Sequence, residues 1–398
     1  MAGGSFAWQS SERHRDDGHC WRQRHLTRDT ADQPRAADLS PKLRLGVIGC
    51  GAITENAHLP AALSSPLIDV TALSDPDSAR LEHLLRQYGL PRIGHTDHRS
   101  VLDRVDAVIL ALPNHLHTPI GVEFLERGIH VLCEKPLALT TAECERLCRA
   151  ARANCATLAV GYVTRFFPST GLLKRLIDSK VAGALHSFEY EFGTAGGWAP
   201  VSGYNLARRT SGGGVLVVSG SHFMDRMLYL FGTARVLQFE DDSRGGIEAN
   251  CRAVFEVAVD GRAIQGRVTL SKTHGLLNRL RVIGEYGVLE IGEGQSSSVT
   301  YLPAEENVRH EITWTTTPVG REDYFRVQLE DFVSAIRNGA EPLVNGEDAS
   351  ASVSLIEECY RQARSLPEPW VDATLDRLRG ALPGRDLDPQ VGVQDTRQ

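Results

Sequence analysis

The first half of the chain alternates short apolar runs with stretches of helical pattern. The apolar runs are Leu43–Ile48, Val70–Leu73, Ala107–Leu112, His130–Cys133 and Thr157–Val160. Between them stand helix signals, namely Asp75-Pro76 as N-cap and first turn, a helix over 118–127 ending at Gly128, and the capping box Thr140–Glu143. Buried strands separated by helices predict β-α-β units, hence a doubly wound Rossmann domain over residues 41–161.

After Tyr162 the period of the pattern changes. Apolar and polar residues alternate over Ser187–Phe192, Cys251–Val259, Ala263–Leu270 and Arg279–Ile283, with glycine turns such as Asp260-Gly261 between them. Alternation of this kind predicts antiparallel strands with one solvated face. Helical patterns lie at 170–179, 322–337 and 347–365. We expect a second α/β domain over 162–383, with its last helices packing back.

The two ends of the chain have no hydrophobic period. Residues 1–40 mix arginine with aspartate and lack the apolar core of a secretory signal. We expect a disordered extension over 1–40 and a disordered tail over 384–398.

Composition narrows the class of protein. The net charge is −7, with no basic arm, which argues against nucleic acid as a partner. No apolar run reaches the length of a membrane span, so we expect a cytoplasmic protein without a membrane partner. Of eight cysteines, Cys144 and Cys148 are spaced by one helical turn, but no C-x-x-C pair accompanies them. We therefore expect buried thiols and no metal site.

A glycine-rich turn follows the first predicted strand. The segment Gly49-Cys50-Gly51-Ala52-Ile53 would let the backbone approach a pyrophosphate at a helix N-terminus, although Thr54 replaces the usual third glycine. Asp75, at the end of the second strand, fits the acid that binds the ribose hydroxyls and repels a 2′-phosphate, so NAD is favoured over NADP. A plain helix cap at Asp75 is an equally good interpretation.

Three further segments make a resemblance specific. Pro113-Asn114-His115-Leu116-His117 follows the third strand, Glu134-Lys135-Pro136 follows the fourth, and Gly212-Gly213-Gly214 precedes a helix with His222 and Asp225. In this order they resemble the Gfo/Idh/MocA oxidoreductases over about residues 43–370. The resemblance implies a Rossmann domain followed by an open, largely antiparallel sheet that commonly joins subunits, here a homodimer or homotetramer. It also implies hydride transfer between nicotinamide and a secondary alcohol of a sugar, cyclitol or nucleotide sugar.

The resemblance assigns roles to residues. Lys135 would lie beside both the nicotinamide and the reacting hydroxyl, where an alcohol losing hydride must also lose a proton. A lysine in that position should have a lowered pKa, and His222 can carry the proton. Further cofactor contacts are implied for Pro113, Asn114, His117 and Glu134, and substrate contacts for Tyr162, Arg165, Trp198, Tyr204 and Asp225. Arg165 could equally be a salt-bridge partner, and the Trp198 and Tyr204 rings could equally pack within their loop.

One position departs from the family pattern. The family usually has aspartate four residues before the histidine, and this chain has Val218. Among nearby polar residues, Asp225 shares the helix face of His222 and could compensate. Two alternatives to a dehydrogenase stay open, an NAD-dependent glycoside-cleaving enzyme of the same family and a non-catalytic dinucleotide-binding regulator. The presence of both Lys135 and His222 favours an enzyme.

Overall fold

A computed structural model describes residues 41–90, 93–194, 203–293, 297–304, 312–316 and 320–367. Its first sheet has the strand order β3-β2-β1-β4-β5-β6, and every neighbouring pair is parallel. The strands are β1 Leu43–Ile48, β2 Ile68–Ser74, β3 Gly94–His95, β4 Ala107–Leu110, β5 His130–Cys133 and β6 Leu158–Val160. The predicted doubly wound Rossmann sheet is confirmed.

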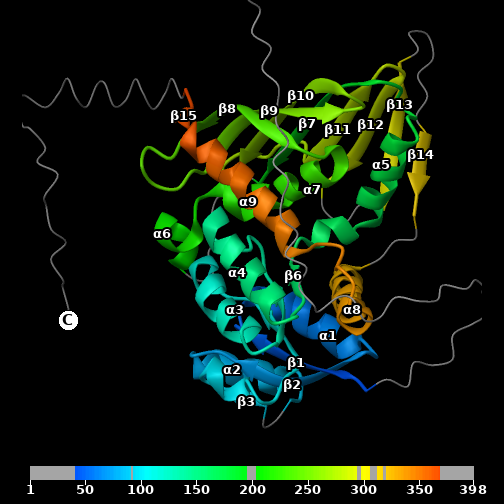
Figure 1. The fold of residues 1–398 in the computed structure, drawn as a ribbon. Helices are drawn as coiled ribbons and strands as arrows, with labels where there is room; N and C mark the ends of the chain where they lie inside the picture. Colours follow the sequence, from blue (N-terminus) through cyan, green and yellow to red (C-terminus); the bar gives the residue numbers. More distant parts are fainter. Residues whose placement is uncertain are drawn as a thin grey trace, which may run out of the picture.

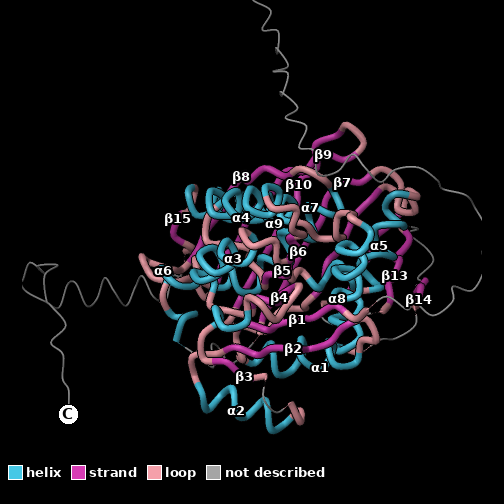
Figure 2. The backbone as a smooth tube through the Cα atoms, turned by 60° about the horizontal axis from the view of Figure 1, so that its bottom comes forward, coloured by secondary structure: helices cyan, strands magenta, loops and turns pink. Residues whose placement is uncertain are grey.

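Helices cover both faces of this sheet (Figure 2). A helical stretch from residue 52 to 64 contains the π-helical turn Thr54–His58 and ends as α1 Leu59–Ser64, and it is followed along the chain by α2 Ser78–Gln87, α3 His117–Leu125 and α4 Thr141–Ala153. The predicted cap of α4 is confirmed, because the Thr140 hydroxyl accepts from the Glu143 amide. The predicted cap of α2 is wrong. Asp77, not Asp75, caps α2, and Pro76 precedes the helix.

The second sheet has the order β14-β13-β12-β11-β7-β10-β9-β8-β15. Its strands are β7 Leu185–Gly193, β8 Ala234–Asp241, β9 Asn250–Val259, β10 Arg262–Ser271, β11 Arg279–Gly284, β12 Gly287–Gly292, β13 Ser298–Pro303, β14 Ile312–Thr315 and β15 Arg364–Ser365. Among the described strands of this second sheet, only β7–β10 and β8–β15 pair in parallel. The predicted, largely antiparallel open sheet is therefore confirmed.

Helices lie on one face of this second sheet, and no described helix covers the other (Figure 1). They include α5 Pro168–Asp178, α7 Ser221–Phe231 and α9 Gly346–Arg361. The short helix α6 Arg208–Ser211 and the π-helical turn Leu216–Gly220 precede α7. The last predicted helix, 347–365, ends at Arg361 in the structure.

Helix α8, Arg321–Asn338, crosses from the second domain back to the first. Its buried face, including Phe325, Leu329 and Phe332, joins one core cluster with residues of α1, α2 and β1. Helix α9 likewise packs against α4 and α7. The hydrophobic effect therefore joins the second half of the chain to the first domain through α8 and α9.

Candidate active site

The glycine turn after β1 is shaped for close approach of a ligand. Gly49 has φ +99°, and a Cβ there would lie 2.2 Å from the Ala111 carbonyl oxygen, so only glycine fits. A Cβ on Gly51 would meet nothing within 4 Å, which leaves the backbone at the start of the 52–64 helical stretch open. The donors at this helix start, Gly51, Ala52 and Ile53 among them, fit the pyrophosphate of a nicotinamide dinucleotide.

Asp75 joins this turn to the end of β2. Its carboxylate accepts hydrogen bonds from the Cys50 amide at 2.7 Å and the Asp77 amide at 2.9 Å. The helix cap is made instead by Asp77, whose carboxylate accepts from the Ala79 and Arg80 amides. The position of Asp75, beside the glycine turn, is the one where an acid meets the adenosine ribose in this fold.

Lys135 connects the two domains at the end of β5. Its ammonium Nζ donates to the Val218 carbonyl oxygen at 2.7 Å, in the π-helical turn before α7. Burial lowers the pKa of Lys135, and Lys272 lowers it further, while Glu134 opposes the change. The predicted depression of this pKa is confirmed in direction.

The Glu134 side chain links the Lys135 backbone to the helical stretch after the glycine turn. Its carboxylate contacts His58 Nε2 at 2.7 Å and accepts from the Lys135 amide at 3.1 Å. A Cβ at Gly161 would lie 3.0 Å from Glu134 Oε1, so the glycine leaves room for the carboxylate. Nothing in the sequence marked His58, which is fully buried in the helical stretch after the glycine turn.

His222, near the start of α7, faces the same region. Its ring meets the Tyr162 ring edge-on, with centroids 6.1 Å apart. Burial lowers the pKa of His222 well below its usual value, and the positive charges of Lys135 and Arg226 add to the effect. Among the described residues no carboxylate hydrogen-bonds to this ring. The imidazole is therefore neutral at physiological pH and can accept a proton.

Asp225 does not compensate for Val218. Both of its carboxylate oxygens accept from Arg165, at 2.7 and 2.8 Å, and Arg165 also reaches Asp348 at 2.9 Å. Asp225 is fully buried and Arg165 is 8% exposed. Arg165 therefore links α7 and α9 through an interior ion pair with Asp225 and a second contact with Asp348, as the salt-bridge interpretation of Arg165 expects. A substrate contact of Arg165 or Asp225 stays a prediction. Tyr162 is fully buried as well, so its ring supports His222 and is not open to a substrate.

Asn114 and His117, two predicted cofactor residues after β4, hydrogen-bond to backbone carbonyls of neighbouring loops. The fully buried His117 ring contacts the Pro136 carbonyl oxygen at 2.9 Å and the Leu112 carbonyl oxygen at 3.0 Å. Asn114 Nδ2 donates to the Ser211 carbonyl oxygen at 2.8 Å across the domain junction. His117 thus fixes the loops after β4 and β5 instead of reaching a ligand, and Pro113 starts the short turn that carries Asn114.

Two glycines of the three-glycine segment are required by close neighbours, one in the loop before β9 and one in α9. A Cβ on Gly214 would lie 1.9 Å from the Glu248 carbonyl oxygen, and one on Gly213 would lie 1.9 Å from the Tyr360 hydroxyl. The Glu248 carboxylate accepts from the Gly214 and Leu216 amides at 2.9 Å and from Tyr360 at 2.8 Å. Glu248 thereby positions the turn that carries Val218 and leads into α7, where His222 lies. No motif in the sequence pointed to it.

One of the two remaining predicted site residues, Tyr204, lies in the 3-10 turn Gly203–Leu206 before α6. Tyr204 is half-buried, and burial raises its pKa, with the negative charge of Glu134 adding to the rise. Trp198 falls outside the described residues.

Other kinds of site find no support in the described part of the chain. No group of three His, Cys, Asp or Glu side chains is arranged for a metal ion. Cys144 and Cys148 are buried free thiols, and burial raises the pKa of Cys148 to about 12. None of the described helices has the length and apolar character needed to cross a bilayer.

A Rossmann sheet with an open glycine turn, and a lysine that bonds across the domain junction to the turn before His222, are the features of an oxidoreductase that binds a nicotinamide dinucleotide. The chain belongs to the Gfo/Idh/MocA oxidoreductase family. Residues 43–162 match its "NAD-binding Rossmann fold" domain and residues 174–371 its "C-terminal alpha/beta domain".

Relatives of known name support the family. A putative UDP-kanosamine synthase oxidoreductase subunit from Amycolatopsis mediterranei is 30% identical, over 86% of this chain and 99% of its own length. The rhizopine catabolism protein MocA of Rhizobium meliloti is 27% identical, over 79% and 93%. A 3-ketoreductase from Actinomadura kijaniata, solved with NADP and TDP-benzene, has a TM-score of 0.72 at 23% identity, over 83% of this chain and all of its own. A levoglucosan dehydrogenase, solved with NADH and L-sorbose, has a TM-score of 0.71 at 20% identity, over 81% and 98%.

Proposed function

We propose that this protein transfers a hydride between a nicotinamide dinucleotide and a secondary alcohol or ketone of a sugar, cyclitol or nucleotide sugar. The observation that carries the proposal is the contact between Lys135 Nζ and the Val218 carbonyl oxygen, one helical turn before His222. This contact brings a cation and a proton acceptor from different domains to one edge of the sheet. Relatives named for sugar and inositol chemistry, such as inositol 2-dehydrogenase 1 of Saccharopolyspora erythraea, support the substrate class.

The residues divide the chemistry between them. Nicotinamide, when bound, supplies or accepts the hydride at its C4. In oxidation, neutral His222 accepts the hydroxyl proton, while the Lys135 ammonium stabilises negative charge that develops on the oxygen. In reduction, the same two groups act in reverse. The Val218 carbonyl and Glu134 keep Lys135 in place, so less reorganisation is needed during the reaction.

The dinucleotide is proposed to be NAD in preference to NADP. The Asp75 carboxylate stands beside the glycine turn, where it would accept from free ribose hydroxyls and repel a 2′-phosphate. NADH should therefore bind about tenfold more tightly than NADPH, which corresponds to roughly 1.4 kcal/mol. Titration of both by nucleotide fluorescence measures the ratio, and equal affinities would remove Asp75 as the discriminating group.

We also propose a homodimer or homotetramer, joined through the face of the second sheet that no described helix covers (Figure 1). Sedimentation or light scattering on the purified protein tests this, and a monomer at micromolar concentration would contradict it.

One panel experiment tests the proposed activity. The purified protein is incubated with NAD or NADP and sugars, cyclitols and nucleotide sugars, and the absorbance of the reduced ring is followed. Turnover with one compound class is expected. If the chain binds dinucleotide but oxidises nothing, while Val218→Asp gains activity, then the chain is a non-catalytic dinucleotide-binding protein.

A further inference from the structure

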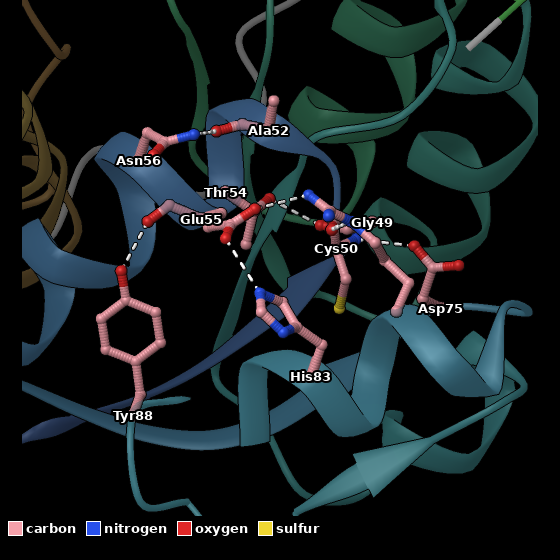
Figure 3. A network of polar contacts seen from close by, with 10 residues as sticks. Gly49, Cys50, Ala52, Thr54, Glu55, Asn56, Asp75, His83 and Tyr88 are labelled. Atoms are coloured by element: carbon pink, nitrogen blue, oxygen red, sulfur yellow. Dashed lines mark hydrogen bonds and ion pairs between the residues drawn. The ribbon is translucent and has the colours of Figure 1, made fainter. Parts of the chain in front are cut away.

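A connected polar network surrounds the glycine turn on the side of Asp75 (Figure 3). Its centre is Arg80, in α2. Arg80 Nε donates to the Cys50 carbonyl oxygen at 2.7 Å, and Nη2 donates to Glu55 Oε2 at 2.7 Å. The Cys50 amide donates to the Asp75 carboxylate, so Arg80 and the ribose-side acid bind the backbone of the same residue.

Glu55 is held in place from three directions. Its amide donates to the Gly51 carbonyl oxygen at 3.0 Å, and its second carboxylate oxygen contacts His83 Nε2 at 3.0 Å. The Tyr88 hydroxyl donates to the Glu55 carbonyl oxygen at 2.6 Å. The pKa of Glu55 is lowered by its hydrogen bonds to His83 and Arg80. An ionised carboxylate is therefore fixed against the guanidinium of Arg80.

NAD and NADP differ at the ribose 2′ position, and this difference suggests a role for the Arg80–Glu55 ion pair. A 2′-phosphate needs a cation, for which arginine is best suited, and a free ribose needs an acceptor. This chain supplies both Asp75 and Arg80 beside the glycine turn, but the charge of Arg80 is neutralised by Glu55. The side chains of Arg80 and Glu55 remain 29% and 19% exposed, so a ligand at the turn would meet the pair.

We propose that Glu55 determines dinucleotide specificity by holding Arg80 in an ion pair and so withholding it from a 2′-phosphate. The proposal rests on the dinucleotide binding proposed above and concerns a second residue besides Asp75. Loss of the Glu55 charge frees Arg80 and removes an acid from the neighbourhood of the phosphate. Both effects favour NADPH.

Glu55→Gln tests the proposal by binding alone. NADH and NADPH are titrated by nucleotide fluorescence against the unmodified protein and the variant. The expected result is a shift of at least about tenfold in the affinity ratio toward NADPH, with NADH affinity changed by less than about threefold. Arg80→Gln added to Glu55→Gln should abolish the shift. Glu82→Gln removes the same charge from an exposed position of α2 and should leave the ratio unchanged.

A second variant covers the case in which Glu55→Gln does not fold. Arg80→Gln alone should change NADPH affinity by less than about threefold, because the ion pair already withholds the guanidinium. A tenfold loss of NADPH affinity in Arg80→Gln, or an unchanged ratio in folded Glu55→Gln, would overturn the role of Glu55 only. If the unmodified protein binds neither dinucleotide, the proposed function fails, and the role of Glu55 fails with it.

Discussion

The surroundings of Lys135 have opposite effects on the charge of its side chain. It is half-buried, and burial lowers its pKa, yet the Val218 carbonyl and the nearby Glu134 favour the charged form. Such a group can hold a developing alkoxide without moving, because its donors are already oriented.

Lys135→Ala should reduce turnover by about a hundredfold or more while NADH affinity stays within a few-fold. Single-turnover kinetics and fluorescence titration measure the two quantities. Lys174→Ala is the matched control, since Lys174 pairs with Asp178 at the surface of α5 and should leave both unchanged. Full activity in Lys135→Ala would remove this lysine from the mechanism.

The lowered pKa of His222 predicts a pH dependence. The neutral ring accepts the proton, so the rate of alcohol oxidation should stay constant at neutral pH. It should fall only below about pH 6.5, the usual histidine value, because the folded pKa lies lower. His222→Ala should lower the plateau by roughly two orders of magnitude.

Val218→Asp supplies the missing carboxylate and serves as the matched variant. A negative charge one turn from His222 stabilises the imidazolium, so the acid limb of the profile should move to higher pH. The profile is measured with one confirmed substrate for all three proteins. An acid limb that stays in place in Val218→Asp would show that His222 does not set it.

At the scale of the elements, a single buried carboxylate fixes the segment that leads into α7. Glu248 accepts from the Gly214 and Leu216 amides and from Tyr360, whose ring also lies under the Arg208 guanidinium. The turn itself is π-helical, an arrangement that occurs often at functional sites.

Glu248→Ala should lower the free energy of unfolding by about 3 kcal/mol, because it leaves buried donors without an acceptor. Tyr360→Phe removes one of these bonds and should cost about 1 kcal/mol. Urea unfolding measures both. Turnover in Glu248→Ala should fall at least tenfold at unchanged NADH affinity, since the turn positions Val218 and His222 but not the glycine turn. Glu256→Ala, in a surface ion pair with Arg235, is the control and should change stability by less than about 0.5 kcal/mol.

At the scale of the whole molecule, the two domains share their cores. Helix α8 belongs to the second half of the sequence, yet Phe332 is 1% exposed within the Rossmann core. Helix α9 adds Val353 to another cluster of that domain. Unfolding of one domain would therefore expose apolar surface of the other, so we expect one cooperative transition.

Phe332→Ala should cost about 3 to 5 kcal/mol and should lower the melting temperature reported by fluorescence and by NADH binding together. Val327→Ala, at a position of α8 that is 44% exposed, should change neither by more than a degree or two. Two separate calorimetric transitions, with only the first shifted by Phe332→Ala, would show that the domains unfold independently.

The sequence by itself determined the class of fold and most of the local chemistry. Short, fully apolar runs between helix signals, such as Ala107–Leu110, indicate strands covered on both faces, and Gly49 occupies a backbone conformation that other residues rarely adopt. Lys135 and His222 were found because motifs tie them to strand and helix ends. These signals are short-range, since each depends on the period or the turn chemistry of neighbouring residues.

Only the tertiary structure decided which polar side chains meet. Asp225 lies on the helix face of His222 but pairs with Arg165, which is 60 residues away in the sequence. Asp75 stood in the place of a helix cap, yet the chain bends so that Asp77 caps α2 and Asp75 reaches the Cys50 amide. Glu55, His58 and Glu248 carried no motif at all. Burial makes an unpaired charge costly, so each polar group takes whichever partner the packing of distant elements brings near it, and sequence spacing does not contain that information.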